Sequence, residues 1–105
     1  MTHEQVLKMV EEMELPCAYG HFAEGQSPEP PFLVFLYPES QNFAADGIAY
    51  FKKRKLHIEL YTDYKSVELE ERIETVLESH GFFYARSEVW IESERLYEVL
   101  YEMEV

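Results

Sequence analysis

Four histidines and one cysteine are the side chains of this sequence that most often carry catalysis or bind metals. His3, His21, His57 and His80 are scattered, and none has a cysteine or acidic residue at the spacing of a metal site. Cys17 lacks the second cysteine of a Cys-x-x-Cys motif, and we interpret it as a buried structural thiol. These patterns predict no metal site and no cofactor.

Acid–base chemistry would need two carboxyl groups, or a histidine and a carboxyl group, held together in a cleft. Glu98, Glu102 and Glu104 share one face of a predicted strand, where solvated carboxylates are the simpler interpretation. His57 stands beside Glu59 on the polar face of another strand, and we interpret it as a surface histidine. A small enzyme that uses His57 and Glu59 stays open as an alternative.

The sequence also lacks the short motifs that several enzyme classes require. Its four glycines stand apart at positions 20, 25, 47 and 81, so they form no glycine-rich phosphate loop. Neither Gly-x-Ser-x-Gly nor His-Glu-x-x-His occurs in the chain. We therefore predict that the protein is not an enzyme.

The stretch 54–62 is the element around which the rest of the chain is arranged. Leu56, Ile58 and Leu60 alternate with polar residues, which predicts a strand with one face on a core. A helix over Val67–His80 follows, because Asp63 and Ser66 offer N-caps and an apolar stripe repeats at helical spacing. Gly81 is expected to end this helix in the left-handed conformation.

The other elements follow from periodicity and from the positions of proline and glycine. A first helix begins at Thr2, with Gln5 completing a capping box, and is ended by Pro16. Further strands are predicted at 18–22, 32–37, 48–53 (leading into 54–62), 82–91 and 96–105. Residues 23–31 form a proline-rich loop, and residues 38–47 form a turn-rich connection.

The sequence therefore predicts one domain over residues 1–105 with an α+β fold. We expect an antiparallel sheet of four to five strands with two helices packed on one face, in the order α-β-β-β-α-β-β. The strand at 32–37 is apolar on both faces, which predicts a place inside the sheet with cover on both sides. Helices would cover one face, and a neighbouring subunit or second layer would cover the other.

The charge of the chain limits its possible partners. Twenty-one acidic residues against nine basic ones give a formal charge of −12, which disfavours ordinary nucleic-acid binding. A basic protein partner, or a surface that lies near DNA without adhering to it, remains compatible with this charge.

The cellular location is also limited by the sequence. The single cysteine excludes an internal disulfide, and no apolar run approaches the ~20 residues of a membrane span. The first residues do not resemble a signal peptide. We expect a soluble intracellular protein.

Three stretches, Phe35–Gly47, Leu56–Asp63 and Ile91–Met103, resemble a family of small proteins encoded by phages and prophages of Gram-positive bacteria. Members resemble head-tail joining or tail-completion (tail terminator) proteins, and the similarity covers essentially the whole chain. The resemblance implies a small α+β sandwich with a structural function and no catalytic residues. It also implies rings, typically hexameric, that contact the tail tube and the head connector. Such a protein would be found in the host cytoplasm during virion assembly and then at the head-tail junction.

Combining the resemblance with the residue patterns gives a hypothesis for the interfaces. Exposed aromatic side chains and sheet edges would join subunits, and the loops at 23–31 and 38–47 would reach toward neighbouring virion proteins. Carboxylate faces would flank the channel, so that DNA passes nearby only as cargo. The residues we expect at interfaces are Tyr61, Trp90, Tyr97, Phe43, Pro30 and Pro31.

A second function class also fits the acidic composition. An acidic phage-encoded inhibitor or DNA mimic would bind a host nucleic-acid enzyme. That class would require paired carboxylates spaced like phosphates along one face of the molecule.

Overall fold

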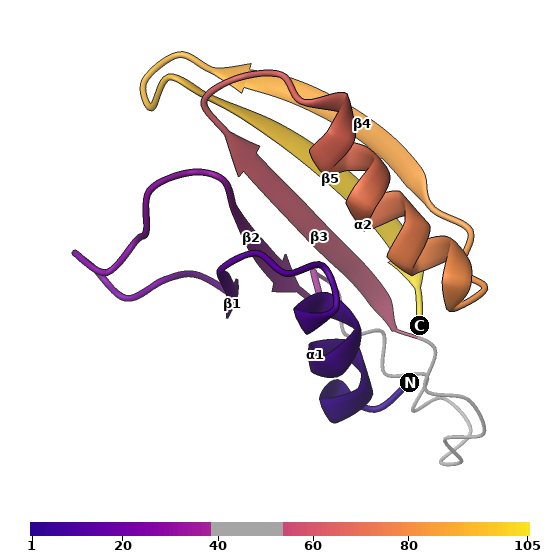
Figure 1. Ribbon diagram of the computed structural model, residues 1–105. Helices are drawn as coiled ribbons and strands as arrows, with labels where there is room; N and C mark the ends of the chain where they lie inside the picture. The colour runs from indigo at the N-terminus through magenta and orange to yellow at the C-terminus, as the bar shows by residue number, and fades with distance from the viewer. Residues whose placement is uncertain (39–53) are drawn as a thin grey trace.

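The structure, a computed structural model, describes residues 1–38 and 54–105, which form two helices and five strands in the predicted order (Figure 1). The helices are α1 (His3–Glu11) and α2 (Val67–Ser79). The strands are β1 (Cys17–Tyr19), β2 (Phe32–Leu36), β3 (Lys55–Thr62), β4 (Ala85–Ile91) and β5 (Leu96–Glu104). The α+β class is therefore as predicted. The predicted strand at 48–53 lies outside the described residues.

The five strands form one sheet in the order β1-β2-β3-β5-β4. Three neighbouring pairs are antiparallel, but β1 and β2 are parallel, so the sheet is mixed and the prediction of an all-antiparallel sheet was wrong. The amide of Leu33 donates to the carbonyl of Pro16 over 2.8 Å, and the amide of Gly20 donates to the carbonyl of Phe35 over 2.8 Å. Parallel strands need a connection that returns the chain to its starting end. The loop between β1 and β2 makes that return.

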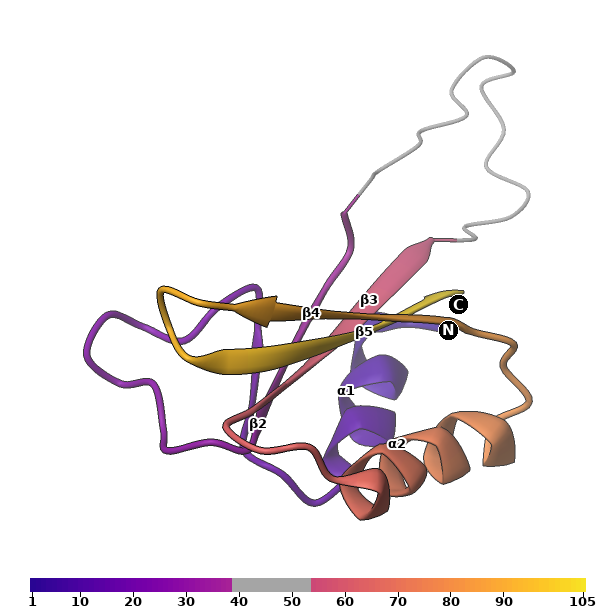
Figure 2. The same cartoon turned by 90° about the horizontal axis from the view of Figure 1, so that it is seen from above.

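Both helices pack on the same face of the sheet, as Figure 1 and Figure 2 show from two directions. Alternate residues of β2, β3 and β5 point toward the helices, and the register places them opposite one another, as Ile58 lies opposite Tyr101. These residues join the helix stripes in a single core. The fully buried members with the largest side chains include Tyr101, Phe35, Met9, Met13, Leu33, Leu56, Ile58, Leu60, Ile73 and Leu77.

The predicted helix caps are present. The amide of Gln5 donates to Thr2 Oγ1 over 3.1 Å, and the Gln5 side chain accepts from the Thr2 amide over 2.8 Å, which completes the capping box. Ser66 Oγ accepts from the Leu69 amide over 3.2 Å at the start of α2. At the other end, the amide of Phe82 donates to the Leu77 carbonyl over 3.1 Å, so the chain leaves α2 through a Schellman turn.

Gly81 supplies the left-handed residue of that turn, with φ of 78°. A Cβ atom there would meet nothing within 4 Å, so only the backbone would oppose a larger residue. We predict that Gly81→Ala lowers the free energy of unfolding by about 1–2 kcal/mol. Gly81→Asn is the matched control and should cost less, because asparagine tolerates this conformation. Urea unfolding monitored by circular dichroism would measure both, and equal losses would contradict the explanation.

We expected a neighbouring subunit or a second layer over the outer face of β2, but a loop of the same chain covers part of that face. Phe32 and Val34 point away from the helices, yet they are only 8% and 7% exposed within a single chain. The ring of Phe22, from the loop after β1, packs edge-on against Phe32 at a centroid distance of 5.3 Å. The doubly apolar sequence of this strand therefore needs no neighbouring subunit to explain it.

Candidate interaction surfaces

Strand β4 forms an exposed edge of the sheet. Arg54 and Val105 exchange both backbone hydrogen bonds, over 3.2 and 2.9 Å, and antiparallel ladders alternate such pairs with non-bonded ones. By this alternation, the odd-numbered residues of β5 bond to β3, and its even-numbered residues bond to β4. The register of β4 with β5 then directs the backbone groups of Ala85, Ser87, Val89 and Ile91 toward β5. The N–H and C=O groups of Arg86, Glu88 and Trp90 consequently point outward, with no strand of the described chain beside them.

Exposed edges usually carry a proline, a bulge or charged side chains that prevent pairing with other chains. β4 has neither a proline nor a bulge, since its register with β5 is continuous over seven pairs, and its side chains from Ala85 to Trp90 are exposed. Its two charged residues, Arg86 and Glu88, are neutralised by ion pairs with each other, with Glu70 and with Lys65. At the opposite side of the sheet, β1 has three residues. The long unprotected edge of β4 can therefore accept an added strand.

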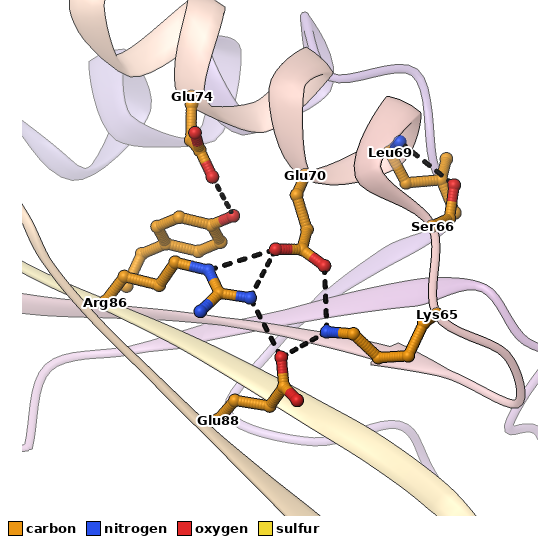
Figure 3. Close-up of polar contacts among 8 residues, drawn as sticks. Lys65, Ser66, Leu69, Glu70, Glu74, Arg86 and Glu88 are labelled. Carbon is orange, nitrogen blue, oxygen red and sulfur yellow. Dashed lines mark hydrogen bonds and ion pairs between the residues drawn. The ribbon is translucent and has the colours of Figure 1, made fainter.

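A network of charges holds β4 against the start of α2 (Figure 3). Arg86 Nε donates to Glu70 Oε1 over 3.0 Å, and Arg86 Nη2 donates to Glu88 Oε1 over 2.9 Å. Lys65 Nζ donates to Glu70 Oε2 over 3.1 Å and also contacts Glu88. Two cations and two carboxylates thus form a neutral cluster that joins β4 to the first turn of α2 and to Lys65 before it.

The network shifts the pKa values of Arg86 and Glu88 so that their charged forms are favoured. Burial alone would lower the pKa of Arg86, but its hydrogen bonds to Glu70 and Glu88 raise it. The hydrogen bond from Lys65 lowers the pKa of Glu88. Nearby, Tyr101 Oη donates to Glu74 over 2.8 Å, and burial together with this carboxylate raises the pKa of the buried tyrosine.

The aromatic residues expected at interfaces lie on opposite faces of the sheet. Trp90 and Tyr97 are cross-strand neighbours on the helix side, with ring centroids 4.7 Å apart. Trp90 is 41% exposed, and its indole N–H donates to Glu92 over 2.5 Å. Tyr97 is only half-buried and packs under Lys65, whose Nζ lies 5.5 Å from the ring centre. Tyr61 is on the face that the helices leave open.

A groove of about 330 Å³ crosses that open face. Its floor is aromatic, because the rings of Phe32 and Tyr61 stack at a centroid distance of 5.2 Å and an interplanar angle of 23°. Its walls come from the loop after β1 and from the hairpin between β4 and β5. The lining residues are Gly20, His21, Phe22, Ser27, Phe32, Val34, Glu59, Tyr61, Ile91, Ser93, Glu94 and Leu96.

Two carboxyl groups lie near one another on the open face, one of them in the groove. Tyr61 Oη donates to Glu59 Oε1 over 3.0 Å, and Glu98 is the cross-strand neighbour of Tyr61 on β5. Burial, together with the nearby carboxylate of Glu59, raises the pKa of Glu98 to about 7. Burial and the same carboxylates raise the pKa of Tyr61 as well. Near neutral pH the carboxyl group of Glu98 is therefore protonated in a large part of the molecules.

The raised pKa of Glu98 makes stability depend on pH with a definite sign. A glutamate in the unfolded chain titrates near 4.3, so between about pH 5 and pH 8 only the folded state must lose this proton. Stability should fall across that window by about 1 kcal/mol, after allowance for the partial exposure of the group. Glu98→Gln should flatten this fall, and Glu102→Gln on the same strand face should not. Urea unfolding at several pH values would measure the slopes, and parallel slopes for Glu98→Gln and the unmodified chain would contradict this account.

The loop residues expected at interfaces differ in their exposure. Pro30 and Pro31 are joined by a cis peptide bond directly before β2, and both are partly buried rather than fully projecting. The preceding residues from Ala23 to Ser27 are exposed, as predicted. Phe43 lies outside the described residues, as does most of the connection at 38–47.

The sequence patterns did not identify two aromatic side chains, Phe83 and Tyr19, that are exposed in the structure. Phe83 is 96% exposed, in the segment between α2 and β4. It was assigned to a strand, but β4 begins only at Ala85, because the Schellman turn carries the chain past Phe82 first. Tyr19 is 54% exposed at the β1 edge, where it packs against His3 and Tyr37. Its position at an edge depends on the sheet order, which no local pattern reveals.

The residues considered for chemistry stay apart in the fold. His57 Nε2 lies 3.5 Å from Glu102 of β5. His80 Nε2 lies 2.6 Å from Glu12 and links the ends of the two helices. Cys17 is partly buried, and this burial raises its pKa. Within residues 1–38 and 54–105, no three His, Cys, Asp or Glu side chains come close enough together to hold a metal ion.

Neither the protein-family models nor the curated proteins with which the chain was compared match it. None of the helices in the described ranges has the length and apolar character needed to cross a bilayer. In the part of the chain that the structure describes, the fold and its surfaces define an α+β domain with one sheet face that no helix covers and with β4 as an unpaired sheet edge.

Proposed function

We propose that the protein is a structural component of phage assembly that acts at the head-tail junction as a ring-forming tail-completion protein. The resemblance of Phe35–Gly47, Leu56–Asp63 and Ile91–Met103 to that family suggests the role. The observation that carries the proposal is the unprotected edge of β4, since a chain that assembles with copies of itself needs such a surface.

The two edges of the sheet suggest how subunits would join. Pairing the β4 edge of one subunit with the β1 edge of the next would use two different surfaces, and such heterologous contacts close into rings. The exposed aromatic side chains Trp90 and Tyr19 lie at these two edges and would add apolar contact there. The charge network around Arg86 would hold β4 in a geometry ready for pairing.

The acidic surface suits the same role. A ring through which DNA passes must not bind phosphates, and exposed carboxylates on β5 such as Glu102 and Glu104 would repel them. An inhibitor that mimics DNA would instead need separate full charges along one face. The raised pKa of Glu98 leaves this carboxyl group partly neutral near pH 7, which weakens the charge on the open face and supports the assembly role over mimicry.

Deletion of the gene from an inducible prophage tests the function directly. We expect lysates in which filled heads and finished tails accumulate separately, visible by negative-stain electron microscopy, with titres restored when the gene is supplied in trans. The same complementation with a stop codon early in the gene is the control. Normal joined, infectious particles from the deletion strain would contradict the proposal.

A further inference from the structure

The sequence of β4 is complementary to itself when two copies run antiparallel. The backbone groups of Arg86 and Glu88 point away from β5, toward the open side of the sheet (Figure 1). In an antiparallel pair, outward-pointing residues of one strand lie opposite outward-pointing residues of the other and exchange both backbone hydrogen bonds. Placing Arg86 opposite Glu88 of a second copy meets this condition and, by symmetry, places Glu88 opposite the partner's Arg86.

We propose that the free edges of two β4 strands pair antiparallel about a two-fold axis at Ser87, so that two chains form one continuous sheet. The proposal rests on the same edge as the proposed ring, and the two contacts exclude one another. The dimer is the form that the chain takes outside a particle, and it must open before the ring can close.

Charge selects this register among its neighbours. Sliding the strands by two residues in one direction would place Arg86 opposite the partner's Arg86, and sliding them in the other direction would place Glu88 opposite the partner's Glu88. Like charges directly opposite one another destabilise a strand pair, whereas opposite charges stabilise it. A slide by one residue is excluded, because it would place outward-pointing residues opposite inward-pointing ones.

The side chains beside these charges match as well. Trp90 comes opposite the partner's Tyr84, the residue directly before β4, and Val89 comes opposite the partner's Ala85. Trp90 is 41% exposed and Val89 is 51% exposed in the single chain, so each has surface left to bury. Cross-strand pairs of two aromatic residues stabilise a sheet. One register therefore pairs opposite charges, two aromatic rings and two apolar side chains.

The length and the local charge of β4 also favour a second copy as its partner. β1 has three residues and β4 has seven, so a second β4 matches the whole edge and β1 matches only part of it. The neutral cluster around Arg86 brings no net charge to the contact, although each chain carries a formal charge of −12. A guanidinium group has five N–H donors, so Arg86 can donate to the partner's Glu88 while it keeps its bond to Glu70.

Disulfide trapping tests the register. A Cys17→Ser background removes the chain's own thiol, and Ser87→Cys then places a new thiol at the two-fold axis. Position 87 faces its own copy as a non-hydrogen-bonded pair, with Cα atoms about 4.5 Å apart, a separation that a disulfide bridges. With copper phenanthroline as the oxidant, we expect most of the chain to migrate as a covalent dimer on a non-reducing gel.

Val89→Cys in the same background is the matched control. Its side chain lies on the same face of β4 and is also exposed, but its two copies would stand about 13 Å apart along the strands. Ser87→Cys should therefore crosslink about tenfold faster than Val89→Cys. Equal rates, or no crosslink at position 87, would overturn the proposal.

Amide hydrogen exchange tests the unmodified chain. In a concentrated sample, the outward-pointing amides of Arg86 and Glu88 should exchange about tenfold more slowly than the amide of Glu24 in the exposed loop. Exchange of all three at the same rate would also overturn the proposal.

The outcomes for the dimer and for the ring are distinguishable. Protection of the Arg86 and Glu88 amides without a crosslink at position 87 would contradict the dimer and leave the ring intact, because pairing with β1 covers the same edge. Joined particles from the deletion strain would contradict the ring and leave the dimer intact.

Discussion

Phe35→Ala is expected to lower the free energy of unfolding by about 3–5 kcal/mol, a large part of the stability of a domain this small. Phe35 is 0% exposed and lies on β2, where the core side of the sheet meets α1. Its ring contacts those of His3 and Tyr19, with centroids 5.9 and 5.4 Å away. Truncation would leave a cavity that the neighbouring strand and helix cannot close without moving. Urea unfolding would measure the loss.

Phe83→Ala is the matched control for that change. It removes the same atoms from a side chain that is 96% exposed, so its effect on stability should stay within about 0.5 kcal/mol. Equal losses for the two phenylalanine variants would mean that the core does not lie between the helices and the β2-β3-β5 part of the sheet.

Glu88→Pro is expected to abolish self-association while the domain stays folded. The amide of Glu88 points away from β5, so a proline there costs no hydrogen bond within the chain but removes a donor from the free edge. Glu88→Ala is the matched control, because it loses the same contacts to Lys65 and Arg86 and keeps the amide. Sedimentation velocity would compare their assembly.

The pattern of results separates backbone pairing from charge. Assembly lost in Glu88→Pro and kept in Glu88→Ala would identify the β4 edge as the subunit interface. Assembly lost in both variants would assign the interface to the charge network instead. Unaltered assembly in Glu88→Pro would contradict the use of this edge.

Local sequence signals were sufficient for most of the elements. Alternation in Leu56–Leu60 identified β3, and Ser66 and Gly81 marked the two ends of α2, because cap residues act through hydrogen bonds and backbone angles within a few residues. The capping box of Thr2 and Gln5 was recognisable for the same reason. On β5, Glu102 and Glu104 are exposed, as expected for a face of solvated carboxylates.

Features that depend on pairing between distant segments could not be predicted in this way. The direction of β1 relative to β2 is determined by the path of the loop after Gly20, which local propensity does not define. The contact of Glu59 with Glu98 arises only once the register of β3 and β5 is known. The same holds for the network that joins Glu70 of α2 to Arg86 of β4.

Multi-angle light scattering of the purified chain, over a wide range of concentration and with and without the tail-tube protein that the proposed function gives it as a partner, tests the central claim most directly. We predict a single closed species at a fixed multiple of the 12.5 kDa chain, favoured by added salt because screening weakens the repulsion between subunits of charge −12. A strict monomer at every concentration and salt, with the tail-tube protein present, would contradict the claim that this sheet offers its free edge to other copies of itself.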